Sequence, residues 1–339
     1  MRNALVGCLL GVCCAFAAEE TVVDGELMHL GKRDGLWYYD LERKPFTGKA
    51  ESKYEDGAKK FSGAFVEGRF DGLILHWWPD GRKKSEEKFE KGKGIGEHLS
   101  WHENGKLKGK MTFKDGKVEG EALSWYANGN KKRRVTFVNN KFEGEMRYWF
   151  EKADDQVVCG YRAGVKHGEE LVYVEPGVLL SKAQYEDGKI HGTYVEYHRN
   201  GKKLEEVSYV KGVKEGTAGK WWSNGRPRVE GKYEAGLKEG LHVQWHENGK
   251  KQIELEYSEG KPDGVMREWT AEGVLIHKAN FRNRELHGEF LRWNEKGELV
   301  ARKVFLEGKE ILAERRLGPG ATEKLKREEG GEAPPPEPQ

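Results

Sequence analysis

The sequence predicts an all-β fold, an elongated repeat array of antiparallel β-hairpins arranged as a single-layer meander that resembles a solenoid. Three observations carry this prediction. An aromatic residue recurs every 24 residues, a glycine follows it by seven positions, and a second aromatic follows it by twelve. A fixed period of this length is typical of repeat architectures, in which each unit packs on its neighbours.

The periodic positions run without a gap through most of the chain. The first aromatic is Phe65, Phe89, Phe113, Phe137, Tyr161, Tyr185, Tyr209, Tyr233, Tyr257, Phe281 and Phe305. The glycines run from Gly72 to Gly288 in the same steps. The second aromatic is Tyr at 173 and 197 and otherwise tryptophan, and we expect these tryptophans to form the structural core: Trp77, Trp101, Trp125, Trp149, Trp221, Trp245, Trp269 and Trp293.

Alternation within each unit indicates strands. Ile253, Leu255 and Tyr257 are interleaved with polar residues, and this period of two is the period of a half-buried strand. Asn-Gly pairs such as Asn104-Gly105 stand between the strands, and we expect tight turns there because both residues can adopt positive φ. A longer glycine-bearing loop, such as 185–192, should lead to the next hairpin. Lys152-Ala153 replaces the turn pair in one copy, which predicts a distorted hairpin.

The ends of the chain differ from the array. We interpret residues 1–18 as a signal peptide, with Arg2 before an apolar run and cleavage near Ala17 or Ala18. This predicts an exported protein in the periplasm, cell envelope or extracellular space, without an integral membrane segment after cleavage. Cys8 lies in a weak lipoprotein box, so lipid anchoring is the less favoured alternative. Residues 19–34 form a lead-in, 35–316 the array with a degenerate capping repeat at 35–64, and 317–339 a disordered tail rich in Pro and Glu.

Several functions are not expected from this composition. Lys and Arg number 59 against 57 Asp and Glu, so no global positive charge favours nucleic acid. His98 and His102 lie four residues apart on one strand, about 13 Å, which is too far for joint metal coordination. Neither catalytic motifs nor cofactor-binding loops occur in the sequence. We therefore expect no catalytic residues, no metal and no cofactor, and a protein that is not an enzyme.

The position directly after the second aromatic carries the candidate binding residues. It faces away from the tryptophan in a strand, and it is often aromatic rather than polar. Exposed rows of this kind mark partner or glycan surfaces, although a twisted sheet that buries this side is an equally good interpretation. Aromatic residues four positions earlier in the same strands, Tyr194 and Phe290, extend this row. The candidate outer face comprises Trp78, His102, Tyr126, Phe150, Tyr194, Trp222, His246 and Phe290.

The unit Tyr-x-x-Gly-x-x-x-Gly-x-x-x-x-Trp-x-x-Asn-Gly, intact at 209–225 and 233–249, resembles the variant MORN repeat of bacterial proteins. The resemblance covers residues 35–308 and implies hairpin repeats that serve as a binding scaffold. Some bacterial members are labelled antitoxins or immunity partners, and eukaryotic MORN repeats are linked to protein and phospholipid contacts.

We therefore hypothesise a non-catalytic repeat scaffold for protein–protein interaction in the periplasm or cell envelope. One alternative is a binder of peptidoglycan or another envelope polysaccharide through the aromatic row. The other is an antitoxin or immunity partner of a toxin. The expected partner is a protein.

Overall fold

The structure is a computed structural model that describes residues 22–31, 34–151, 156–175, 177–316 and 322–325. Within these ranges the regular elements are β-strands and one short 3-10 turn, η1 (Gly25–Leu27), and the strands form an open antiparallel sheet of hairpin repeats. The predicted all-β hairpin fold is therefore confirmed. The chain divides into two compact units, Met1–Lys131 and Lys132–Gln339.

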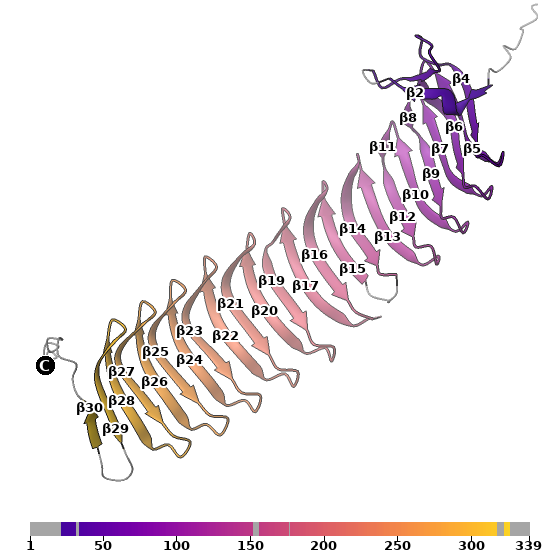
Figure 1. Ribbon diagram of the computed structural model, residues 1–339. Coiled ribbons are helices and arrows are strands. Elements are labelled where there is room, and N and C mark those ends of the chain that lie inside the picture. Colours follow the sequence, from indigo (N-terminus) through magenta and orange to yellow (C-terminus); the bar gives the residue numbers. More distant parts are fainter. Residues whose placement is uncertain (1–21, 32–33, 152–155, 176, 317–321, 326–339) are drawn as a thin grey trace, which may run out of the picture. The chain divides into compact units, whose positions relative to one another are not determined.

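The first unit begins with three short strands that precede the repeats. Strand β1 pairs in parallel with β4, whereas β2 and β3 form a separate two-stranded sheet. The remaining strands follow one another across the sheet in chain order (Figure 1), with β8 and β9 both pairing with β7, and β11 and β12 both pairing with β10. The strands of this unit are β1 (Val22–Asp24), β2 (Met28–Leu30), β3 (Trp37–Tyr39), β4 (Gly48–Lys53), β5 (Lys59–Val66), β6 (Arg69–Trp77), β7 (Lys83–Glu90), β8 (Lys93–Gly94), β9 (Gly96–Trp101), β10 (Leu107–Lys114), β11 (Lys117–Val118) and β12 (Gly120–Trp125).

The second unit repeats the same hairpin, and its strands pair antiparallel in chain order, with β18 and β19 both pairing with β17. Its strands are β13 (Lys131–Val138), β14 (Lys141–Trp149), β15 (Gln156–Arg162), β16 (Val165–Tyr173), β17 (Leu179–Glu186), β18 (Lys189–Ile190), β19 (Gly192–Tyr197), β20 (Lys203–Val210), β21 (Val213–Trp221), β22 (Pro227–Glu234), β23 (Leu237–Trp245), β24 (Lys251–Ser258), β25 (Lys261–Trp269), β26 (Leu275–Arg282), β27 (Glu285–Trp293), β28 (Leu299–Leu306), β29 (Lys309–Arg316) and β30 (Thr322–Leu325).

The Asn-Gly turns are three-residue loops and not the two-residue turns that we expected. His102 N donates to Lys106 O at 2.9 Å, and Gly105 N donates to His102 O at 2.9 Å. Gly105 has a φ of +81°, but Asn104 does not adopt positive φ. A type I turn followed by one left-handed glycine satisfies these bonds. Asn104 instead accepts a hydrogen bond from Lys106 N through its side chain, at 3.1 Å.

The expected long loops are in fact the tight turns. Strand β10 pairs Lys114 with Lys117 of β11, which leaves only Asp115 and Gly116 in the turn, with φ of +50° and +79°. Two residues with positive φ match the twist of the flanking strands. The same turn recurs at Glu67-Gly68, Lys91-Gly92, Asn139-Asn140, Ala163-Gly164, Asp187-Gly188, Lys211-Gly212, Ala235-Gly236, Glu259-Gly260, Asn283-Arg284 and Glu307-Gly308.

The periodic glycine produces a bulge in the second strand of each hairpin. In the β5–β6 pair, Gly63 faces Ile74 and Phe65 faces Phe70, so Ala64 alone lies opposite three residues centred on Gly72. Gly72 has a φ of +99°, which residues with a side chain rarely adopt. The bulge bends the strand and explains why glycine recurs at this position.

The two periodic aromatics lie on opposite faces of the sheet. Residues paired across strands share a face, and Phe89 pairs with Gly72, whereas Trp77 lies an odd number of positions from Gly72 on the same strand. We call the side of the first aromatic the Phe/Tyr face and the side of the second the Trp face. On the Phe/Tyr face, the His98 ring lies between Phe89 and Phe113, with centroid distances of 5.3 and 4.2 Å.

Most of the fully buried side chains belong to the Phe/Tyr face. They are small or branched residues close to the aromatic ladder, and include Ile74, Ala122, Val135, Cys159, Ala183, Val207 and Ala279. The N-terminal end has a denser cluster, in which Phe46, Ala50 and Phe65 are buried and Trp37 and Phe70 pack against them.

Three of the predictions concern residues that lie outside the described ranges or close to their end. The signal peptide and the distorted hairpin at Lys152-Ala153 lie outside them. We assigned no structure to the tail from residue 317, but Thr322–Leu325 form β30, which pairs with β29. The composition of the tail did not indicate this strand, because only four residues of the tail form it.

Candidate functional site

The predicted core tryptophans are half-buried and lie on the Trp face. None of the eight is among the fully buried side chains of the described residues. Lysines lie over several of their rings: Lys59 over Trp77, Lys83 over Trp101 and Lys203 over Trp221, with Nζ 5.8, 5.9 and 5.5 Å from the ring centroids. These tryptophans therefore combine packing with cation–π contacts at a wet surface.

Four of the predicted outer-face residues form hydrogen bonds between repeats. Trp78 and Trp222 donate through Nε1 to the carbonyl oxygens of Trp101 and Trp245, both at 3.3 Å. His102 and His246 bond through Nε2 to the carbonyl oxygens of Trp125 and Trp269, at 2.9 and 3.0 Å. These side chains lie at the start of the turn, after the strand has ended, and reach sideways to the next repeat.

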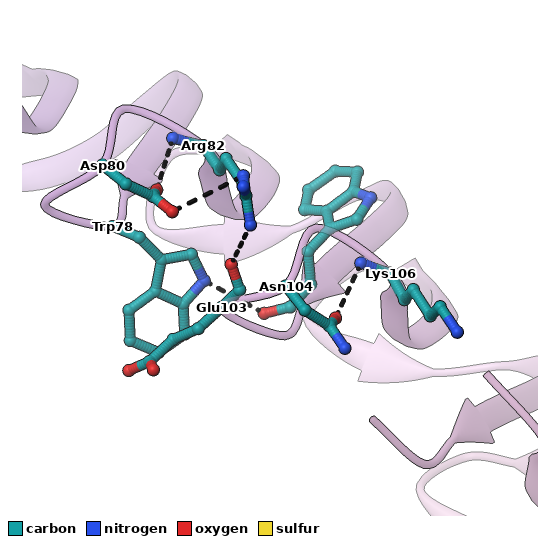
Figure 2. A network of polar contacts seen from close by, with 7 residues as sticks. Trp78, Asp80, Arg82, Glu103, Asn104 and Lys106 are labelled. Carbon is teal, nitrogen blue, oxygen red and sulfur yellow. Dashed lines mark hydrogen bonds and ion pairs between the residues drawn. The ribbon is translucent and has the colours of Figure 1, made fainter. Parts of the chain in front are cut away.

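The turns themselves extend this network. Figure 2 shows Asp80 accepting from Arg82 N at 3.0 Å while the Arg82 guanidinium donates to Glu103 O in the next turn at 2.9 Å. Asn104 Nδ2 in turn donates to Ala127 O at 2.6 Å. These turns are thus fixed against their neighbours by side chains that hydrogen-bond to backbone carbonyls.

The other four candidates lie in different settings. Tyr126 is half-buried at a turn, and Phe150 is 45% exposed with its ring against Tyr148. Tyr194 and Phe290 belong to the Phe/Tyr face, where burial raises the pKa of Tyr194 to about 12. The eight residues therefore do not form one row.

The second unit contains a cavity of about 520 Å³ on the Trp face, which the sequence analysis missed. Gly219 on β21 is its floor, and a Cβ there would lie 2.6 Å from the Trp221 ring, so the indole lies flat across the glycine. Other repeats carry Leu or Val at this position, such as Leu99 and Val195. Without a side chain at Gly219, the Trp221 ring lies across the strand and lines the cavity.

Carboxylates flank this floor on both sides. Gly219 pairs with Glu206 of β20 and with Glu230 of β22, so both acidic side chains lie beside it on the Trp face. Thr217, Lys232 and Glu239 are cross-strand neighbours at one end of the cavity, and Leu241 adds an apolar wall. The volume is within the range of sites that hold a ligand group.

The arrangement suits binding better than acid–base chemistry. A general acid needs a carboxyl group in an apolar, dry site. Here Lys203 forms an ion pair with Glu206, and Glu230 is exposed. No group of His, Cys, Asp and Glu suited to a metal occurs among the described residues. The described ranges also contain no helix long and apolar enough to cross a membrane.

Comparisons with known proteins find a family match for four segments of the chain. Residues 95–115, 118–139, 190–211 and 238–259 match the MORN repeat variant family. No curated protein matches the chain. Two solved structures, TcdB2-TccC3 and TcdB2-TccC3-Cdc42, align with 79% of this chain at 11% and 8% identity, with TM-scores of 0.17 and 0.16. The chain spans 18% and 19% of those chains.

Proposed function

We propose that this chain, a repeat protein whose matched segments are MORN repeat variants, is a non-catalytic scaffold that binds a protein partner in the periplasm or cell envelope. The observation that carries the proposal is the cavity over Gly219. It combines an aromatic wall, an apolar side chain and exposed charge on a rigid β surface. Interfaces are anchored at such sites, where a partner side chain loses its water.

The hydrogen-bonded turns support a binding role. Bonds such as Asn200 Nδ2 to Ser223 O, at 2.8 Å, recur with the repeat and hold neighbouring hairpins in register. A surface that is already ordered loses little conformational entropy when a partner binds. The apolar segment before Glu19 supports export.

Affinity capture from an envelope extract tests the proposal against polysaccharide binding. The chain should retain a defined protein in stoichiometric amount, and the complex should survive digestion of peptidoglycan. Sedimentation with purified peptidoglycan should leave the chain in the supernatant. Co-sedimentation without protein capture would favour the glycan alternative. Capture of a toxin would select the antitoxin alternative, and cytosolic fractionation of the uncleaved chain would contradict the proposed location.

A further inference from the structure

Three repeats place a lysine beside a glutamate on the Trp face. Lys83 Nζ lies 2.6 Å from Glu86 Oε2, and the same ion pair forms between Lys203 and Glu206 and between Lys251 and Glu254. In each case the lysine is the first residue of a strand and the glutamate lies three positions later. The pair is thus a repeated element of the array.

One repeat lacks the lysine but keeps the glutamate. Pro227 is the first residue of β22, and Glu230 follows it by three positions. Among the described residues, the Glu230 side chain makes no hydrogen bond or ion pair, and it is exposed. Glu230 therefore lacks the lysine partner that Glu86, Glu206 and Glu254 have.

The unpaired carboxylate belongs to the cavity. Glu230 lies directly across from Gly219, next to the Trp221 ring. In the preceding repeat, Lys203 contacts Glu206 and lies over the Trp221 ring, which shows how a cationic side chain lies on this surface. Glu230 and Trp221, on neighbouring strands beside Gly219, likewise offer a carboxylate and an indole to a cation from outside.

The charge around the cavity favours such a ligand. Glu206, Glu230 and Glu239 line it together with a single cation, Lys232. Lys203 neutralises Glu206, and Glu239 accepts a hydrogen bond from Glu259 N at 2.9 Å. Glu230 therefore remains as the carboxylate without a fixed partner.

We propose that this site receives a lysine or arginine side chain of the protein partner. Its charged group pairs with Glu230, and its aliphatic stem lies against the Trp221 ring and Leu241. This inference rests on the proposed function, since it specifies the chemistry by which the same cavity recognises a protein.

Fluorescein-labelled octalysine is the probe, and anisotropy measures its affinity for the full chain at about 0.15 M salt, where long-range attraction is screened. The wild-type chain should bind it saturably. Glu230→Gln should weaken binding about tenfold, the effect of losing one charge-assisted hydrogen bond. Pro227→Lys should weaken it similarly, because lysine occupies the same position in two neighbouring repeats and would pair with Glu230.

Glu86→Gln is the matched control, because Lys83 already occupies that carboxylate. It should bind octalysine like the wild-type chain. Circular dichroism and the urea midpoint verify that each variant folds. Equal binding by all variants, or equal weakening by Glu86→Gln, would overturn the inference.

Two further experiments distinguish failure of this inference from failure of the proposed function. A chitosan tetramer that binds at Glu230 while octalysine does not would replace the protein side chain by an amino sugar and overturn the inference. If Glu230→Gln captures the protein partner as well as the wild-type chain does, the inference fails and the scaffold function stands. If octalysine requires Glu230 but no protein is captured, the proposed function fails instead.

Discussion

Trp222 Nε1 donates a hydrogen bond to the carbonyl oxygen of Trp245, 23 positions later in the chain, at 3.3 Å. The bond joins the end of one hairpin to the end of the next. Arg228 lies over the same indole, 4.6 Å from its centroid. Trp222 therefore has a structural role, whether or not it also contacts a partner.

Replacing Trp222 tests this role. Trp222→Ala should lower the free energy of unfolding by about 1–3 kcal/mol, because it leaves a carbonyl unpaired and removes ring packing. Trp222→His should retain much of the stability, since His198 and His246 make the same bond at this repeat position. Urea denaturation measures both. Equal losses in the two variants would show that the bond contributes nothing.

The two kinds of turn should differ in their response to glycine. Asp115→Gly should change stability by less than about 0.5 kcal/mol, because relief of the left-handed conformation offsets the added chain entropy. Asn104→Gly should cost about 1–3 kcal/mol, because two hydrogen bonds are lost without any relief of strain. Thermal unfolding compares the variants. A neutral Asn104→Gly would contradict the three-residue loop.

His242 should make the stability of the chain depend on pH. Burial among Tyr233, Tyr257 and the nearby Lys238 lowers its pKa from the ordinary 6.5. The fold therefore favours the neutral ring, whose contribution is complete above pH 6.5 and is lost as pH falls, because the unfolded chain takes up the proton first.

The control for His242 comes from the array itself. Met146 and Met266 occupy the same repeat position, so His242→Met should fold and should reduce the loss of stability between pH 7.5 and 5. Unfolding free energies measured across this range test the prediction. An unchanged pH profile would exclude His242. His76, whose pKa is also lowered by burial, should account for part of the dependence that remains.

The contact between Gly219 and the Trp221 ring predicts the effect of a side chain at position 219 on stability. Gly219→Ala places a Cβ where the Trp221 ring lies, so the indole must move and stability should fall by about 1–3 kcal/mol. The loss should be smaller in a Trp221→Tyr background, since tyrosine stands at this position in two repeats and is smaller. A double-mutant cycle measures the coupling. Strict additivity would show that the two residues do not interact.

The sequence predicted the period, the strands and the location of the turns, because these follow from aromatic and glycine spacing. It did not distinguish the two turn types: Asn104-Gly105 has the composition of a two-residue turn, but the hydrogen bond from Lys106 N to Asn104 favours a three-residue loop. The sequence also did not predict the surroundings of Trp78, because the carbonyl oxygen that accepts its hydrogen bond belongs to Trp101 in the next repeat.

The cavity had a signal in the sequence. Alignment of the repeats shows Gly219 where leucine or valine is common and Pro227 where neighbouring repeats carry lysine. Each departure by itself is consistent with surface variation. Only the register, which places Glu230 beside Gly219, shows that the departures meet at one place.

Site-specific photo-crosslinking tests the central claim, that a protein partner binds over the Gly219 cavity. Leu241 lines the cavity and is 49% exposed, and Leu73 occupies the same repeat position in the other unit with 48% exposure. A photoreactive residue at position 241 should give one dominant, protease-sensitive adduct in cells, and the same residue at 73 should give none. Equal adducts at both positions, or none at 241 in cells where the partner is captured, would contradict the account.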